Sequence, residues 1–332
     1  MSNSKENKWR ISVVTPTLRR PEEVDGLLKN LSAQQQLPIE VIVVDGAPEH
    51  ENATELVVNR LRDSLPFAVY FIRHNGGTAI QRNVGIENAK GGLIALLDDD
   101  VRLEPDFLKK MVAVFSSDAD SHVGGVVGYR TNRHFAAADS QRWRWYKRLR
   151  LLSVYEPGRY DFECGYPINN NMQPPFAGTR EVDFMTTACA VWRREVFDSG
   201  LRFDPFFSNY GVLEDAHLSL RAGKRWKLLQ CGDAHCIEMH SPNGREDRRK
   251  IGYKSVINYY YVFSDLAGPL SAGQQFRFWR FQAFELLRIT ISAVRRRRLD
   301  DVRDVTGRLR AIGGLIRRTR RNERTLVINA KS

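Results

Sequence analysis

Short apolar runs alternate with amphipathic segments through the first hundred residues. Continuous apolar runs predict strands over residues 11–15, 39–46, 68–72 and 93–97. Between them, a helix is predicted to begin at Pro21, and two more cover residues 53–61 and 79–89. Strands that lack polar alternation are buried on both faces. This order therefore predicts an α/β fold in which helices flank a mainly parallel central sheet.

Beyond Gly128 the pattern is less regular. Residues 130–180 are rich in aromatics, arginines and turn formers, with one helix predicted near residues 141–152. Further on, the pattern predicts a strand over 184–192, a short helix from Arg194, a helix over 213–222 and a strand near 227–230. After His240 the sequence is helical in character to its end.

The most informative feature is the apolar run over residues 93–97, which leads directly into Asp98, Asp99 and Asp100. Three adjacent carboxylates repel one another, so their close placement calls for a cation or strong hydrogen-bond donors. A solvated acidic turn is the simpler alternative. A helix is expected to begin at Pro105, which would put the carboxylates in a strand-to-helix connection, where α/β proteins bind ligands.

The composition is that of a globular protein, since 42% of the 332 residues are apolar and 10% are aromatic. The charge is unevenly distributed. Residues 241–332 carry 21 Lys and Arg against 8 Asp and Glu, a net of +13, whereas residues 1–240 carry a net of −1. The two parts are therefore expected to face different partners.

The basic C-terminal quarter predicts amphipathic helices. Between Phe276 and Arg295, arginines on one helical face accompany apolar and aromatic residues. No apolar run approaches the roughly 20 residues of a transmembrane helix. Basic amphipathic helices suit an anionic membrane surface, and a helical cap packed on the preceding domain is the alternative. No recognised module accompanies the arginines, so nucleic acid is not expected as a partner.

Five segments, in this order, resemble the signature of family 2 glycosyltransferases. They are Ser12-Val13-Val14-Thr15-Pro16-Thr17, Val41-Ile42-Val43-Val44-Asp45, Arg82-Asn83-Val84-Gly85, Leu97-Asp98-Asp99-Asp100 and Glu214-Asp215. The resemblance covers roughly residues 10–240. It implies an inverting enzyme with the GT-A fold, which transfers a sugar from a nucleotide donor.

The resemblance also implies a donor site. Its nucleotide-binding residues would be Thr15, Pro16, Thr17, Asp45, Arg82, Asp98 and Asp99, and Asp100 would hold Mg²⁺ or Mn²⁺ beside the diphosphate of a donor, in this family usually a UDP-sugar. A divalent cation offsets the charge that develops on the leaving phosphate. Many relatives have Asp-Asp-Gly-Ser after the second strand, where this chain has Asp45-Gly46-Ala47-Pro48.

Inversion by a single displacement requires a general base beside the acceptor hydroxyl. The family places this base in the acidic pair, which predicts Asp215 as the catalytic residue with Glu214 as the second candidate. A helix N-terminus favours the charged carboxylate. Acids are common at helix starts, so a capped helix is the alternative reading of the same pair.

Two further assignments follow from relatives. His240 is a candidate metal ligand, with a hydrogen-bonded structural histidine as the alternative. Trp192 resembles the acceptor-side region of the fold, with a packed core aromatic as the alternative. Cys231, His235, Cys236 and His240 could indicate zinc, but their spacing fits no common zinc template.

The predicted organisation is a disordered start over residues 1–9, a nucleotide-sugar-binding half over 10–128, an acceptor-binding half over 129–240 and a basic helical region over 241–332. The expected function is metal-dependent transfer to a saccharide, lipid-linked acceptor in surface polysaccharide synthesis. The four cysteines lack a disulfide framework, and the polar N-terminus lacks a secretory signal. These features predict a cytoplasmic enzyme, and the basic helices predict a peripheral position on the inner face of the membrane. The alternatives are a sugar nucleotidyltransferase and a non-catalytic membrane or nucleic-acid adaptor.

Overall fold

The computed structural model describes residues 8–133, 141–208, 211–239 and 246–329. It divides into two compact units. The first comprises Met1–Arg144, Val154–Tyr160 and Pro167–Arg245, and the second comprises Trp145–Ser153, Asp161–Tyr166 and Glu246–Ser332. The second unit thus includes two short segments that end about 90 and 80 residues before its C-terminal part begins at Glu246.

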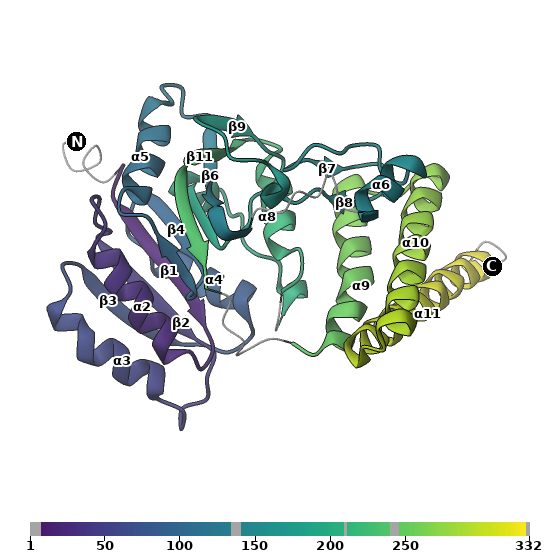
Figure 1. Ribbon diagram of the computed structural model, residues 1–332, viewed down its shortest axis with the longest axis horizontal. Coiled ribbons are helices and arrows are strands. Elements are labelled where there is room, and N and C mark those ends of the chain that lie inside the picture. The colour runs from purple at the N-terminus through teal and green to yellow at the C-terminus, as the bar shows by residue number, and fades with distance from the viewer. Residues whose placement is uncertain (1–7, 134–140, 209–210, 240–245, 330–332) are drawn as a thin grey trace. The chain divides into compact units, whose positions relative to one another are not determined.

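The first unit is built on a twisted sheet, in the order β3-β2-β1-β4-β10-β6-β11-β5 with β9 also paired to β11 (Figure 1). The strands are β1 (Ile11–Thr17), β2 (Glu40–Asp45), β3 (Ala68–Arg73), β4 (Leu93–Leu97), β5 (Val101–Leu103), β6 (Val123–Arg130), β9 (Thr179–Glu181), β10 (Cys189–Arg193) and β11 (Lys227–Glu238). The pairs β1–β2, β2–β3, β1–β4 and β6–β11 are parallel, and the pairs made by β5, β9 and β10 are antiparallel. The predicted α/β fold with a mainly parallel sheet is confirmed.

Helices connect these strands. They are α2 (Pro21–Ser32), α3 (Ala53–Leu61), α4 (Thr78–Asn88), α5 (Phe107–Ser117), α7 (Arg194–Asp198) and α8 (Glu214–Ala222). Elsewhere the chain forms α6 (Gln141–Arg148) and a two-stranded sheet of β7 (Tyr160–Asp161) and β8 (Tyr166–Pro167).

Burial explains why these segments adopt these structures. Every residue of β1, β2 and β4 is buried, as expected of strands covered on both faces. In α2, Pro21 occupies the first turn and the buried residues Val24, Leu27 and Leu31 follow helical spacing. α4 packs closely on β1, because a Cβ at Gly85 would lie 2.2 Å from Val14 Cγ1.

The sequence pattern missed or misjudged several strands. β6 was not predicted, because its glycines resemble those of a loop. In the structure they allow close packing within the strand, since a Cβ at Gly125 would lie 2.3 Å from the Met185 side chain. β5, only three residues long, lies within the predicted strand-to-helix connection, and the following helix begins at Phe107 rather than Pro105. β10 is shorter than predicted. β11 is longer, because it resumes pairing with β6 at His235 after a register shift and pairs with β5 up to Glu238.

The second unit consists mainly of α9 (Arg248–Ala267), α10 (Ala272–Arg296) and α11 (Leu299–Asn329), as the C-terminal pattern predicted. Phe263 of α9 stacks on Phe278 of α10 with ring centroids 6.1 Å apart. Val256 packs with Ala311 and Leu315 in a core cluster between α9 and α11. Across the described residues, we find no helix with the length and apolar character needed to span a membrane.

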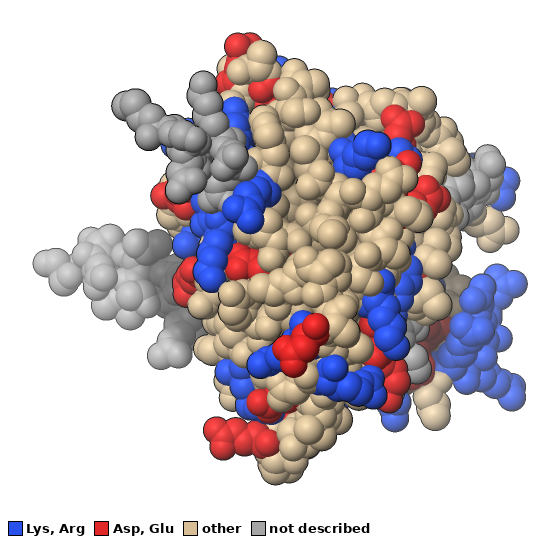
Figure 2. All heavy atoms as spheres, turned by 90° about the vertical axis from the view of Figure 1, so that its left-hand side faces the viewer, with Lys and Arg blue, Asp and Glu red and all other residues tan. Residues whose placement is uncertain are grey.

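The two signs of charge are mixed on the face of the molecule seen from the left-hand side of Figure 1. There, acidic and basic side chains are interspersed around a broad surface of other residues (Figure 2). This mixture agrees with the near-zero net charge of residues 1–240.

Candidate active site

The carboxyl ends of β1 and β2 bring together the residues predicted to bind the nucleoside. In the parallel register Thr17 lies opposite Asp45, and Thr15 is two residues earlier on the same face of β1. Pro16 lies between the two threonines in the buried strand. The three polar side chains therefore share one face at the edge of the sheet where α/β proteins bind ligands.

Two buried oxygens at this edge lack a hydrogen-bond partner in the described part of the chain: Thr15 Oγ1 and Asp45 Oδ2. The other carboxylate oxygen, Asp45 Oδ1, accepts from the Ala47 backbone N–H at 2.9 Å. Buried polar atoms are almost always hydrogen-bonded in native proteins. A bound base or ribose could supply the missing donor to Asp45 Oδ2.

The three carboxylates after β4 have three different environments. Asp98 is the most accessible, with 35% of its side chain exposed. Asp99 is buried and accepts hydrogen bonds from Thr17 Oγ1 at 2.7 Å and from Arg20 Nη1 at 2.8 Å. Asp100 has 10% of its side chain exposed, and its Oδ2 lies 3.9 Å from Arg20 Nη1. Burial raises the pKa of Asp99 to about 6 against the opposing effects of Arg20 and Thr17.

Arg82 joins the turn after β4 to the start of α8. Its guanidinium is buried, and Nη2 donates to Asp98 Oδ1 at 2.8 Å while Nη1 donates to Glu214 Oε1 at 3.2 Å. Its Nε atom is buried without a hydrogen-bond partner among the described residues. The structure thus gives Arg82 two carboxylate partners, one from each predicted half of the site.

The acidic pair occupies the first turn of α8, after a residue in a strained conformation. Leu213 has φ 71°, in the left-handed region, which costs a non-glycine residue about 1–2 kcal/mol. This turn directs the chain into the helix at Glu214, which is buried against Arg82. Asp215, which keeps only a small part of its surface exposed, accepts a hydrogen bond from the Ala216 backbone N–H at 2.7 Å.

Asp215 has the electrostatics of a base that works near neutral pH. Burial and the neighbouring charge of Glu214 raise the pKa of Asp215 from 3.8 to about 7. The Ala216 N–H and the positive charges of Arg82 and Arg130 oppose this shift. A carboxylate whose pKa lies near the working pH is best suited to accept a proton and release it again.

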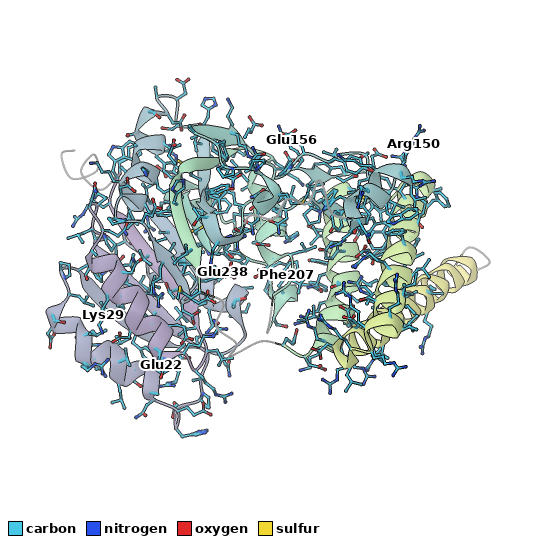
Figure 3. The ribbon with its side chains drawn as sticks, viewed as in Figure 1. Glu22, Lys29, Arg150, Glu156, Phe207 and Glu238 are labelled. Carbon is cyan, nitrogen blue, oxygen red and sulfur yellow. The ribbon has the colours of Figure 1, made fainter. Side chains whose placement is uncertain are left out.

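Arg20 and Arg130 were not singled out by sequence reasoning. Arg130 ends β6, and its Nη1 donates to Glu238 Oε2 of β11 at 2.7 Å. Glu238 is labelled at the end of β11 in Figure 3. An arginine that ends a buried strand could have been noticed, but only if β6 itself had been predicted.

The carboxylates fit a divalent cation that completes its coordination with substrate. In the part of the chain that the structure describes, no group of three or more His, Cys, Asp or Glu side chains could hold a metal ion by itself. Mg²⁺ and Mn²⁺ are hard cations that accept one or two carboxylates together with substrate phosphates. Asp98 and Asp100 offer such oxygen ligands, one accessible and one nearly buried.

The histidines and cysteines considered as metal ligands have different neighbours. His240 lies outside the described residues. His235 and Cys236 are consecutive on β11 and project to opposite faces of the sheet. His235 Nδ1 lies 3.3 Å from Glu104 Oε2, whereas Cys236 hydrogen-bonds the Cys189 thiol.

Trp192 is fully buried in β10, opposite Ile94 of β4 and Gly125 of β6. Its ring centroid lies 5.8 Å from that of Phe197. These surroundings are those of a packed core aromatic, the alternative considered for this residue. The side chain has no exposed surface with which to contact an acceptor.

Comparisons with known proteins give the site its context. Residues 12–201, more than half of the chain, match Glycosyl transferase family 2. The uncharacterized glycosyltransferase YwdF of Bacillus subtilis (strain 168) is 35% identical over 248 residues, covering 74% of this chain and 80% of that protein. Glucosyl-dolichyl phosphate glucuronosyltransferase of Haloferax volcanii is 30% identical over 122 residues, 36% of this chain and 38% of that protein.

A solved structure shares the fold. The mannosyltransferase PcManGT from Pyrobaculum calidifontis, in complex with GDP-Man and Mn²⁺, superimposes with a TM-score of 0.52 at 16% identity, covering 92% of this chain and 74% of that one. The sheet and its flanking helices thus have the GT-A fold. The chain belongs to glycosyl transferase family 2, as its sequence motifs predicted.

Proposed function

We propose that the protein is a metal-dependent inverting glycosyltransferase that moves a sugar from a UDP-sugar to a saccharide acceptor. The acceptor is a lipid-linked saccharide used in surface polysaccharide synthesis. The observation that carries this proposal is the bridge made by Arg82, which holds the donor-side Asp98 and the Glu214–Asp215 pair at one site.

The reaction follows from these side chains. The acceptor oxygen attacks the anomeric carbon, the bond from that carbon to the diphosphate oxygen breaks, and the nucleoside diphosphate leaves with the electron pair. The acceptor proton passes to the carboxylate of Asp215, whose near-neutral pKa suits it to this role. Attack opposite the leaving group inverts the configuration of the anomeric carbon.

Donor binding is assigned to the strand ends. Asp45 and Thr15 would bind the nucleoside through their unsatisfied oxygens. Asp100 would hold Mg²⁺ or Mn²⁺, which would supply a counter-charge for the diphosphate when bound, and Asp98 would face the nucleoside. Asp99 would stabilise the turn after β4, because its two oxygens accept hydrogen bonds from Thr17 and Arg20. Arg82 would approach the nucleotide from the position in which it bonds Asp98 and Glu214.

The pH dependence of the reaction tests the base. Only ionised Asp215 accepts the proton, so kcat is expected to rise with pH and to level off above the pKa of about 7. Glu214→Gln removes the charge that raises this pKa and should shift the rising limb to lower pH. Arg130→Gln removes an opposing positive charge and should shift the limb to higher pH. The measurement is a pH–rate profile of all three proteins.

The opposite signs of the two shifts distinguish electrostatic tuning from damage to the fold. A general loss of structure would lower the rate of both variants without moving their profiles in opposite directions. Coincident limbs in the three proteins would rule out Asp215 as the group that titrates.

The surface of α10 in the second unit supports the proposal that the acceptor is bound to a membrane. Four apolar side chains, Phe276, Leu287, Ile291 and Val294, lie on one side of α10 with 48–73% of their surface exposed. Four consecutive arginines, residues 295–298, follow directly. Apolar side chains beside cations suit the interface of an anionic bilayer. The name of the Haloferax relative contains a lipid-linked sugar, glucosyl-dolichyl phosphate.

Vesicle binding tests this assignment. Ile291→Glu places a charge in the exposed apolar stripe and should weaken sedimentation with vesicles of phosphatidylcholine and phosphatidylglycerol by about tenfold. Leu56→Glu is the matched control, because Leu56 is a similarly exposed leucine of α3. Equal sedimentation of both variants and the wild type would remove α10 from the proposed membrane contact.

A further inference from the structure

Three arginines of the second unit line one crevice that the reaction does not use. The crevice has a volume of about 300 Å³ and is formed by the turn after α6, the loop after β7 and the first half of α10. Its lining residues are Arg150, Leu151, Leu152, Ser153, Glu163, Cys164, Arg277 and Arg280. Figure 3 shows Arg150 beside the end of α10 at which that helix begins.

Arg150 occupies a backbone position that ordinarily takes glycine. The chain leaves α6 through two hydrogen bonds, from Leu151 N to the Tyr146 carbonyl at 3.0 Å and from Arg150 N to the Lys147 carbonyl at 3.1 Å. This pair of bonds is a Schellman motif, whose left-handed residue is usually glycine. Arg150 has φ 48° there. Non-glycine residues in this conformation concentrate at functional sites.

Arg280 is held by one hydrogen bond and one aromatic contact, and one of its N–H donors lacks a partner among the described residues. One terminal nitrogen, Nη2, donates to the Arg150 carbonyl, and the guanidinium lies 5.9 Å from the Phe276 ring. Its Nε atom is buried and has no hydrogen-bond partner within the described residues. An unsatisfied N–H on a fixed guanidinium is ready to bond an anion.

The charge of the crevice is positive. Glu163, its only acidic lining residue within the described chain, is paired with Arg277 at 2.8 Å. The nearby carboxylate of Asp161 is occupied, since it accepts from the backbone N–H and the hydroxyl of Ser153 at 2.6 Å each. The charges of Arg150 and Arg280 therefore have no carboxylate partner among the lining residues.

We propose that this crevice binds a phosphate group, either free or as part of a lipid headgroup. Guanidinium groups bind phosphate through paired, charge-assisted hydrogen bonds. Arg280 would donate from Nε, and Arg150 would contribute its guanidinium. The Ser153 hydroxyl is committed to Asp161, so the arginines carry the recognition. The proposal goes beyond sugar transfer and does not depend on it.

The test exploits the strained position of Arg150. Arg150→Gly removes one wall of the site but places the preferred residue in the Schellman motif, so Tm should stay equal or rise. Arg297→Gly is the matched control, because Arg297 also has φ 48°, follows α10 and does not line the crevice. In isothermal titration of the full chain with inorganic phosphate, Arg150→Gly should bind about tenfold more weakly than the wild type, whereas Arg297→Gly should bind as the wild type does.

Vesicles of phosphatidylcholine with phosphatidic acid then identify the source of the phosphate. For this comparison the control is Arg19→Gly, because Arg19 also has a left-handed φ of 56° and lies in the first unit, outside the proposed membrane contact. Weaker sedimentation of Arg150→Gly than of Arg19→Gly would assign a lipid headgroup. Equal sedimentation, with the difference kept for inorganic phosphate, would assign a free phosphate. Titrations in which Arg150→Gly and Arg297→Gly match, or in which the wild type binds no phosphate, would overturn the site.

Discussion

Asp215→Asn is expected to lower kcat by roughly 10³-fold, because asparagine cannot accept the acceptor proton and general-base catalysis contributes about 10²–10⁴-fold. The substitution keeps the size of the side chain. The amide can still bond Ala216 N–H through its oxygen. The measurement is the steady-state rate of sugar transfer, with nucleotide binding followed in parallel by calorimetry.

Stability separates this loss from misfolding. Burial raises the pKa of Asp215, so the folded state disfavours the ionised carboxylate, and its contribution to stability declines as the pH rises through about 7. A neutral asparagine avoids that cost, so Tm at pH 8 should equal or exceed the wild-type value. Asp198→Asn, at an exposed carboxylate that ends α7, should retain wild-type activity. An Asp215→Asn enzyme with undiminished kcat would exclude Asp215 as the base.

The second large effect concerns Asp100. Asp100→Asn replaces a charged ligand of the proposed cation by a neutral one, so transfer should fall by about 10²–10³-fold. In addition, UDP binding should lose most of its dependence on Mn²⁺. The measurement is a calorimetric titration of UDP with and without Mn²⁺, combined with the transfer rate.

Asp106→Asn is the matched control for Asp100. Asp106 is a partly exposed aspartate a short distance along the chain, and its carboxylate pairs with Lys110 rather than with the site. Its variant should bind UDP with the wild-type metal dependence. An Asp100→Asn protein whose UDP affinity still responds fully to Mn²⁺ would remove Asp100 from the proposed metal site.

Much of the fold could be predicted because its central strands have a clear sequence signal. β1, β2 and β4 are continuous apolar runs whose every residue is buried, and the periodicity of α2 matches its buried face. β6 was not predicted, because its glycines are required for close packing against neighbouring side chains. That requirement is visible only in the tertiary structure. Likewise β5 pairs with a strand more than a hundred residues later in the chain, so no local pattern marks it.

In the candidate site, too, local motifs could be recognised from the sequence, whereas contacts between distant segments could not. Local motifs named Asp45, Asp98 and Asp215, whose surroundings suit the proposed roles. The bridge from Arg82 to Glu214 spans 132 residues of sequence, so no local motif could show that these two side chains are bonded. Trp192 was predicted from its resemblance to the acceptor-side region of the fold, but the side chain is fully buried by its neighbours in the sheet.

The most direct test of the proposed function is NMR analysis of the sugar released or transferred from a panel of UDP-, GDP- and dTDP-sugars in the presence of Mn²⁺. An α-linked donor should give a β-configured first product, and chelation of the metal should stop the reaction. An α-configured first product, or a rate that chelation leaves unchanged, would contradict metal-dependent inverting transfer.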